Sequence, residues 1–454
     1  MKKIIQKGAA MRNNYRLQQA LWIVLFILLV FTPVVVLIIG FTPSTYLNPL
    51  HDASLAFGFI GLALMAVQFI LTARIKRIKE PFGSDLIYHF HRQISIAAFF
   101  LVLAHPILLF IADSGYLRYL NIFTAPLSIK LGVIAIFLLI LTVISAEYRK
   151  KLKIHYDFWK FWHGILTTVV VSAALIHIFL TGTYLHYQPL RIIWLVYSAS
   201  FILLLLYTRL IYPLTLIHNK YTVSSIQEER GQSWTVKLRS SRNKALHFQP
   251  GQFAWLTIWK TPFSDSEHPF SISSSSERPE EISFTIKDVG KFTTTIKTMQ
   301  VGQVVYVDGP HGAFSLDRHP HAERLVFIAG GIGITPIMSM LRSMADREDQ
   351  RPSKLFYNNR DWDSITFREE LEKLQQSLNL EIIYTLEKPP QKWDGETGFM
   401  TQDILHKYLG NEWTKDGTEI FMCGPQVMMD IVEKQCRAEG FSETQIHFEL
   451  FNLV

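Results

Sequence analysis

Cysteine is nearly absent from this chain of 454 residues. The two cysteines, Cys423 and Cys436, both lie in the polar C-terminal part. An extracellular disulfide is therefore excluded, which agrees with a C-terminal half that lies in the reducing cytosol.

Apolar runs dominate the first 215 residues, whereas the remainder has the composition of an ordinary globular protein. Six runs are each long enough to cross a membrane as a helix. They cover residues 21–41, 53–73, 88–112, 127–146, 159–181 and 191–212. The first run is too long for the apolar part of a cleaved signal peptide, so we interpret it as a retained helix.

Lysine and arginine are scarce in the loops at 42–52, 113–126 and 182–190, and they cluster in the other connections and before the first run. Positive charge at membrane proteins gathers on the cytoplasmic side. We therefore expect a multi-pass protein of the cell membrane with both termini in the cytoplasm. The net charge of +7 is explained by this flanking pattern, and no nucleic-acid partner is expected.

Two apolar runs each contain two histidines that are 14 residues apart. The pairs are His91 with His105, and His163 with His177. Fourteen residues of helix rise about 21 Å and make nearly four turns, so both histidines of a run face one side. Both helices run outwards under the predicted topology, so His91 is expected opposite His163 and His105 opposite His177. Such pairs are the ligand set for two bis-histidine haems of type b.

The alternative for any one of these histidines is a hydrogen-bonded core residue. A second alternative is a non-enzymatic ion or proton conductor that uses the histidines as a relay.

After Tyr212-Pro213 the pattern changes to short strands separated by turns such as Pro250-Gly251, which predicts a small antiparallel barrel. From about residue 323, strands alternate with helices, which predicts an α/β nucleotide-binding domain with a parallel sheet.

Two segments carry phosphate-binding patterns. Thr293 and Thr294 stand at a predicted helix start, where backbone amides and a hydroxyl can hold a phosphate. The segment 330–336, Gly-Gly-Ile-Gly-Ile-Thr-Pro, follows a strand and opens a helix. Its glycines allow close approach of a pyrophosphate, with Thr335 expected as the helix cap and Pro336 as the first helical residue.

Arg360 lies just after a predicted strand, where an arginine can pair with the 2′-phosphate of NADPH. An ordinary surface arginine is the competing interpretation. NADPH is favoured over NADH on this basis.

Four motifs occur in a characteristic order: HPFS (268–271), GPHGAFS (309–315), AGGIGITP (329–336) and MCGP (422–425), followed by a C-terminal aromatic residue. This order resembles the flavin domain of ferredoxin-reductase type. With six helices and paired histidines, residues 50–454 resemble the NADPH oxidase and ferric reductase family. His268 agrees with the membrane branch, because soluble plant-type reductases tend to have arginine there.

The resemblance implies a membrane α-helical bundle of six spans, a cytosolic antiparallel β-barrel that binds FAD and an α/β domain that binds NAD(P)H. The expected bounds are a cytosolic segment at 1–20, the haem-binding helices at 21–215, the FAD domain at 216–320 and the NAD(P)H domain at 321–454.

The resemblance also assigns site residues. FAD would be lined by His268, Pro269, Phe270 and Ser271, with Ser271 near flavin N5, and its pyrophosphate side would be held by Lys287, Gly290, Thr293 and Thr294. NADPH phosphates would lie against Gly330, Gly331, Gly333 and Thr335, and the nicotinamide against Cys423 and Gly424. Phe451 would stack on the flavin until nicotinamide displaces it, although the family's aromatic is often closer to the terminus and here three residues follow.

The expected activity is transfer of electrons from cytosolic NADPH, through FAD and two haems, to an external small-molecule acceptor. Oxygen, giving superoxide, is preferred, and a ferric chelate is the alternative. The chain has no EF-hand loop and no extended cytosolic insertion, so we expect no obligatory protein partner beyond the membrane lipid.

Overall fold

The structure is a computed structural model, and it describes residues 2–40, 48–73, 75, 78, 82, 84–218, 220–242, 245–258, 261–264, 266–413 and 416–449. The chain forms two compact units. One contains residues 16–82 and 86–213, and the other contains residues 1–15, 83–85 and 214–454.

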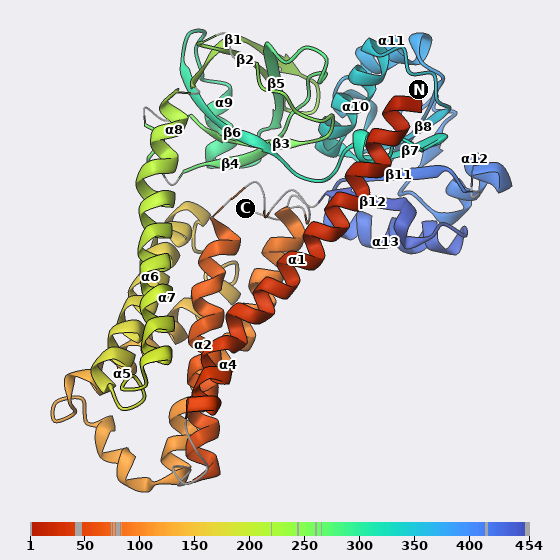
Figure 1. Cartoon of the computed structure of the whole chain (residues 1–454). Coiled ribbons are helices and arrows are strands. Elements are labelled where there is room, and N and C mark those ends of the chain that lie inside the picture. The colour runs from red at the N-terminus through yellow and green to blue at the C-terminus, as the bar shows by residue number, and fades with distance from the viewer. Residues whose placement is uncertain are drawn as a thin grey trace. The chain divides into compact units, whose positions relative to one another are not determined.

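Six helices of the described chain are long and apolar enough to cross a membrane, as the sequence predicts (Figure 1). They are α1 (Lys2–Gly40), α2 (Pro49–Thr72), α4 (Ser84–Ala112), α5 (Leu127–Glu147), α6 (Tyr156–Thr181) and α7 (Gln188–Leu206), which continues through a π-helical turn (Tyr207–Ile211) into α8 (Tyr212–His218). Large apolar side chains such as Phe100, Phe137 and Leu203 are exposed on these helices, which suits contact with lipid.

The helix ends differ from the expected ones at two places. Helix α1 begins at Lys2, so the segment predicted to precede the first span is part of one continuous helix. The last apolar helix extends to Ile217, beyond the expected end at 212, and Pro213 lies just after the π-helical turn Tyr207–Ile211, where the regular hydrogen-bond ladder is already interrupted.

Pro33 interrupts the hydrogen-bond ladder of α1 because proline has no amide hydrogen for the Leu29 carbonyl. The Tyr197 hydroxyl of α7 donates to that carbonyl instead. An apolar environment makes such replacement necessary, since a bare carbonyl there would cost several kcal/mol. The interaction ties α1 to α7.

The first sheet of the other unit is antiparallel, with strand order β4-β3-β6-β1-β2-β5. Its strands are β1 (Lys220–Glu229), β2 (Ser233–Ser240), β3 (Phe253–Thr257), β4 (His268–Ser271), β5 (Glu281–Lys287) and β6 (Val304–His311), and the short helix α9 (Lys291–Ile296) follows β5. A bridge between Ile272 and Phe284 connects the two edges, as expected for a barrel.

The second sheet is parallel, with strand order β10-β9-β8-β7-β11-β12. Its elements are β7 (Arg324–Gly330), α10 (Ile334–Asp346), β8 (Ser353–Asn359), α11 (Arg368–Ser377), β9 (Leu380–Leu386), β10 (Glu396–Thr397), α12 (Gln402–Trp413), β11 (Thr418–Cys423), α13 (Gln426–Ala438) and β12 (Ile446–Glu449). Alternate residues of β7 pack on opposite faces. Leu325 and Phe327 lie in the core with α10 and α11, whereas Val326 and Ile328 lie in the core with α12 and α13 (Figure 1).

The carboxyl ends of β7 and β11 meet at the point where the strand order reverses, which is the ligand edge of such a sheet. The GGIG segment follows β7, and Cys423 ends β11. The fold therefore places the two expected nucleotide motifs at one edge.

Arg342 of α10 joins the two sheets. Its guanidinium donates two hydrogen bonds to Glu370 at 2.7 and 2.6 Å and a third to the Ser273 carbonyl at 2.6 Å. Ser273 belongs to the antiparallel part and Arg342 to the parallel part. A planar, bidentate arrangement of this kind gives orientation as well as attraction.

We predict that Arg342→Met destabilises the two-sheet unit by about 1.5–3 kcal/mol, because the Glu370 carboxylate and the Ser273 carbonyl lose charged donors. Thermal unfolding followed by release of flavin fluorescence measures this change. Arg278→Met is the matched control, since Arg278 also pairs across the two parts with Asp346 at 2.6 Å but is 70% exposed, and it should shift the midpoint little. Equal shifts in the two variants would contradict the assignment.

Candidate functional site

The four predicted histidines lie on two helices as expected, His91 and His105 on α4 and His163 and His177 on α6. His105 lies within electrostatic range of His177, and His163 lies within electrostatic range of His91. The structure thus brings the histidines together in the two pairs that the helix directions predict. The exposed His89 of α4 lies outside these pairs.

His105 and His177 are each held by a neighbouring helix. His105 Nδ1 lies 2.9 Å from both the carbonyl and the hydroxyl oxygen of Ser54 on α2, and His177 Nδ1 lies 2.7 Å from the Ser128 carbonyl of α5. A carbonyl only accepts, so Nδ1 carries the hydrogen in both rings. The lone pair of each imidazole is therefore on Nε2, which is the state that a metal ligand needs.

Glycines one turn beyond these serines make room for the rings. A Cβ atom on Gly58 would lie 3.1 Å from His105 Nδ1, and one on Gly132 would lie 3.0 Å from His177 Nδ1. Both contacts are tighter than an ordinary van der Waals contact, so each glycine allows the imidazole to reach the carbonyl of the preceding turn. This repeated Ser-x-x-x-Gly arrangement fits a ligand pair held in a fixed orientation.

His91 and His163 have a different support. His91 Nδ1 lies 2.6 Å from Oε1 of the buried Gln68. The ring of His163 packs 4.9 Å from that of Trp159, and its Nδ1 has no hydrogen-bond partner among the described residues. Within the described part of the chain, His163 therefore lacks the acceptor on Nδ1 that the other three rings have. The donor chemistry of all four histidines fits haem iron.

In the antiparallel sheet, the HPFS strand and the predicted phosphate turn lie together. The His268 ring packs on Phe292 at 3.9 Å between centroids, which holds the start of α9 against β4. The Thr293 hydroxyl accepts hydrogen bonds from the amides of Val289 and Gly290, both at 2.9 Å. Thr293 therefore shapes the turn, and the Thr294 hydroxyl donates to Asp288 at 2.6 Å. Lys287 ends β5 just before this turn.

Ser271 ends β4, is buried, and its hydroxyl has no hydrogen-bond partner among the described residues. Phe253 lies between Ser271 and His311 in the sheet. A buried hydroxyl of this kind suits a polar atom of a bound cofactor, such as the flavin N5 that the family resemblance implies. Pro269 and Phe270 precede it on the same strand.

The nucleotide motifs pack directly on each other. A Cβ on Gly333 would overlap with the Cys423 carbonyl, and one on Gly330 would lie 2.7 Å from Met428 Sδ. A Cβ on Gly424 would lie 3.1 Å from the Gly330 amide nitrogen. In contrast, no atom lies within 4 Å of a Cβ placed on Gly331, so that glycine faces open space where a phosphate could approach.

The expected cap of α10 is wrong. The helix begins at Ile334 with Gly333 as its cap, because the Thr335 hydroxyl donates to the Ile332 carbonyl at 2.7 Å and does not accept a backbone amide. Pro336 is accordingly the third helical residue, still within the turn that needs no amide hydrogen.

Arg360 follows β8 at the same sheet edge and is exposed, and it makes no ion pair with another described residue. Phe451 lies outside the described residues.

Glu449 is a site residue that the motifs did not reveal. It is buried, and it pairs with Cys423 across β12 and β11. A Cβ on Gly312 would lie 2.9 Å from its carboxylate, so Glu449 connects the nucleotide edge with the GPHGAFS segment. The sequence feature that could have indicated Glu449 is a carboxylate within the short apolar strand before Phe451. His311 Nε2, 2.9 Å from the buried Asp308, was also missed.

Three family models match consecutive parts of the chain. The ferric reductase like transmembrane component matches residues 57–174, an FAD-binding domain matches 219–315, and an oxidoreductase NAD-binding domain matches 327–434. In this order the three matches make up the domain architecture of the NADPH oxidase and ferric reductase family. The transmembrane match contains His91, His105 and His163 and ends three residues before His177.

Curated relatives are similar over part of their length. The reductase component of propane 2-monooxygenase from Mycolicibacterium smegmatis is 28% identical over 50% of this chain and 66% of the relative. NADH-cytochrome b5 reductase 1 from Pyricularia oryzae is 31% identical over 38% of this chain and 57% of the relative. The chain thus spans less than two thirds of either relative. Models and relatives together indicate an NAD(P)H-dependent oxidoreductase.

Among solved structures, the cytochrome b5 reductase domain of Ulva prolifera nitrate reductase matches 51% of this chain and 96% of that chain, with 21% identity and a TM-score of 0.46.

We predict that Gly333→Ala raises the KM for NAD(P)H about tenfold or more, because the added methyl group must push the GGIG turn away from the Cys423 carbonyl. Steady-state reduction of an artificial acceptor measures KM. Gly440→Ala is the control, since a Cβ there meets nothing within 4 Å, although its left-handed backbone (φ +99°) makes it a more strained site than Gly333 (φ −60°). That control should lose some stability and keep its KM; an unchanged KM in Gly333→Ala would refute the packing argument.

Proposed function

We propose that this protein is a transmembrane oxidoreductase that passes electrons from cytosolic NADPH, through FAD and two b-type haems, to an external acceptor. When bound, FAD accepts a hydride from NADPH and releases electrons singly, which the haems carry one at a time. The observation that carries the proposal is the pairing of His105 and His177, each with its Nδ1 hydrogen on a backbone carbonyl.

The role of each pair follows from its level on the helices. His91 and His163 would hold the inner haem and His105 and His177 the outer haem, with both chain termini in the cytoplasm of a cell-membrane protein. Each haem would be held by one histidine of α4 and one of α6, a ligand set that supplies one-electron transfer. Each electron that moves outwards goes toward the positive side of a membrane whose inside is negative, so a potential of 100 mV favours the transfer by about 2.3 kcal/mol.

The reductase residues act on the flavin side. Ser271 would hydrogen-bond the flavin near N5, while Thr293 and the amides of its turn would fix the pyrophosphate. Gly331 and Gly333 would admit the nucleotide phosphates, and Cys423 would lie against the nicotinamide. The exposed position of Arg360 after β8 supports NADPH, although one relative is named for NADH.

Oxygen is the proposed acceptor, with superoxide as the product. A ferric chelate is the second candidate, and the match of residues 57–174 to a ferric reductase like component favours it. No obligatory protein partner is proposed.

His177→Leu and His105→Leu test the proposal. Each variant should keep NADPH-dependent flavin reduction, lose about half of the haem absorbance in the dithionite-reduced spectrum and lose acceptor reduction, because one axial ligand of the outer haem is gone. His89→Ala, on the same helix as His105, is the control and should retain both haems. Full haem content in either leucine variant would contradict the assignment of His105 and His177 as haem ligands.

The same preparations identify the acceptor. NADPH consumption is compared in air and under argon with a ferric chelate. Consumption that needs oxygen and reduces cytochrome c in a superoxide-dismutase-sensitive way supports the oxidase. An equal rate under argon with the chelate, with little added by oxygen, would replace it with a ferric reductase.

A further inference from the structure

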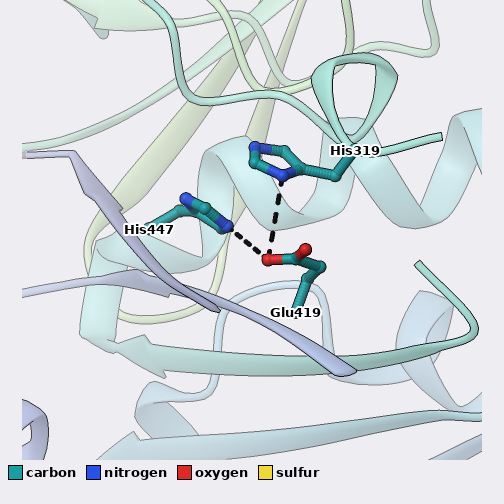
Figure 2. Close-up of side chains that lie close together, drawn as sticks. All are labelled: His319, Glu419 and His447. Atoms are coloured by element: carbon teal, nitrogen blue, oxygen red, sulfur yellow. Dashed lines mark hydrogen bonds and ion pairs between the residues drawn. The ribbon is translucent and has the colours of Figure 1, made fainter. Parts of the chain in front are cut away.

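His319, Glu419 and His447 come from three separate segments and point at one another (Figure 2). Their ligating atoms all lie within 4.8 Å of one another. His319 follows the 3-10 turn Leu316–Arg318, Glu419 lies on β11, and His447 lies on β12. No motif and no step of the proposed electron path uses these side chains.

The distances suit a small cation. His447 Nε2 lies 2.7 Å and His319 Nδ1 lies 3.7 Å from the same Glu419 oxygen. Ligands about 2.0–2.2 Å from a tetrahedral zinc ion are roughly 3.4 Å apart. His319 is already near that spacing, and His447 would need to withdraw by less than about 1 Å.

The two imidazoles also pack closely, with ring centroids 3.8 Å apart. On one tetrahedral ion the two ring centroids would lie about 5 Å apart, so binding would spread the rings by about 1 Å and hold both as neutral ligands. The three side chains are between 20% and 23% exposed, which leaves a path for an ion.

We propose that His319, Glu419 and His447 bind one divalent transition-metal ion of the zinc type. Two imidazoles and one carboxylate form a known zinc ligand set with a fourth position for water. The set is wrong for magnesium, which prefers six oxygen ligands.

The ion would connect parts of the molecule that the nucleotide site depends on. Phe421 pairs with His447 and Cys423 with Glu449 in the parallel ladder, so the cluster lies on the same face of the two strands as Cys423 and Glu449, because side chains alternate. A metal at this place would tie β12 to β11 and to the segment that follows GPHGAFS.

The test measures zinc bound by the full-length, untagged holoprotein after chelation and dialysis against ZnCl2, with MgCl2 as the competing ion. Wild type should bind one equivalent of zinc more than Glu419→Gln or His319→Gln. The zinc affinity of each variant should fall by more than about 100-fold, since even changes outside the ligand shell cost 10–100-fold. His406→Ala is the control, because His406 pairs with a single carboxylate, Glu439, at 2.9 Å. It should keep the full stoichiometry.

Two further readouts make the result decisive if a variant is unstable. Flavin content and NADPH–ferricyanide activity report folding of each variant. X-ray absorption at the zinc edge of wild type should show nitrogen and oxygen ligands near 2.0 Å with the outer-shell pattern of two imidazoles. The proposal is overturned if wild type and Glu419→Gln bind equal zinc, if magnesium displaces it, or if the spectrum lacks imidazole.

Discussion

An imidazole in the apolar interior of a helical bundle needs a partner for each of its two ring nitrogens. In His105 and His177 the Nδ1 hydrogen is accepted by the carbonyl of a serine on a neighbouring helix. The other nitrogen is thereby left as a lone-pair donor. The need for an acceptor at each Nδ1 requires α2 and α5 to lie beside the histidines, with Gly58 and Gly132 leaving room for the rings.

The two histidine pairs of the bundle differ in how this requirement is met. His105 and His177 rest on backbone carbonyls, and His105 Nδ1 also lies 2.9 Å from the Ser54 hydroxyl. His91 rests on the Gln68 side chain. Orientation of a ring and basicity of its ligand nitrogen both depend on what the other nitrogen bonds. The two proposed haems therefore have different surroundings, which gives the protein a means of ordering their potentials.

The reductase unit depends on close backbone packing in the same way. Gly333 lies on the Cys423 carbonyl, and Gly312 admits the Glu449 carboxylate. Cys423 and Glu449 are paired across two adjacent strands. Consecutive contacts therefore link the GGIG segment, through Cys423 and Glu449, to the GPHGAFS segment. Arg342 fixes the two sheets that contribute to it.

Much of this arrangement is predictable from the sequence because it depends on the spacing of apolar residues and on the order of the motifs along the chain. The six apolar helices, the antiparallel and parallel sheets and the histidine pairing follow from run length, alternation and the rise of a helix. Gln68, Ser54 and Ser128 could not be predicted, since they lie far from the histidines in sequence and two of them act through backbone atoms. Glu449 and the cluster of His319, Glu419 and His447 depend on the register of β12 with β11, which no local pattern encodes. The Thr335 cap failed because a hydroxyl can donate to a carbonyl as readily as it accepts an amide.

Sidedness tests the central claim most directly, because electrons must cross the bilayer if both histidine pairs hold haem. The protein is inserted into sealed vesicles with ferricyanide trapped inside, and NADPH is added outside. The account predicts that the trapped ferricyanide is reduced at the expense of external NADPH. Reduction of ferricyanide only when it is placed on the same side as NADPH, with the trapped pool unchanged, would contradict the account.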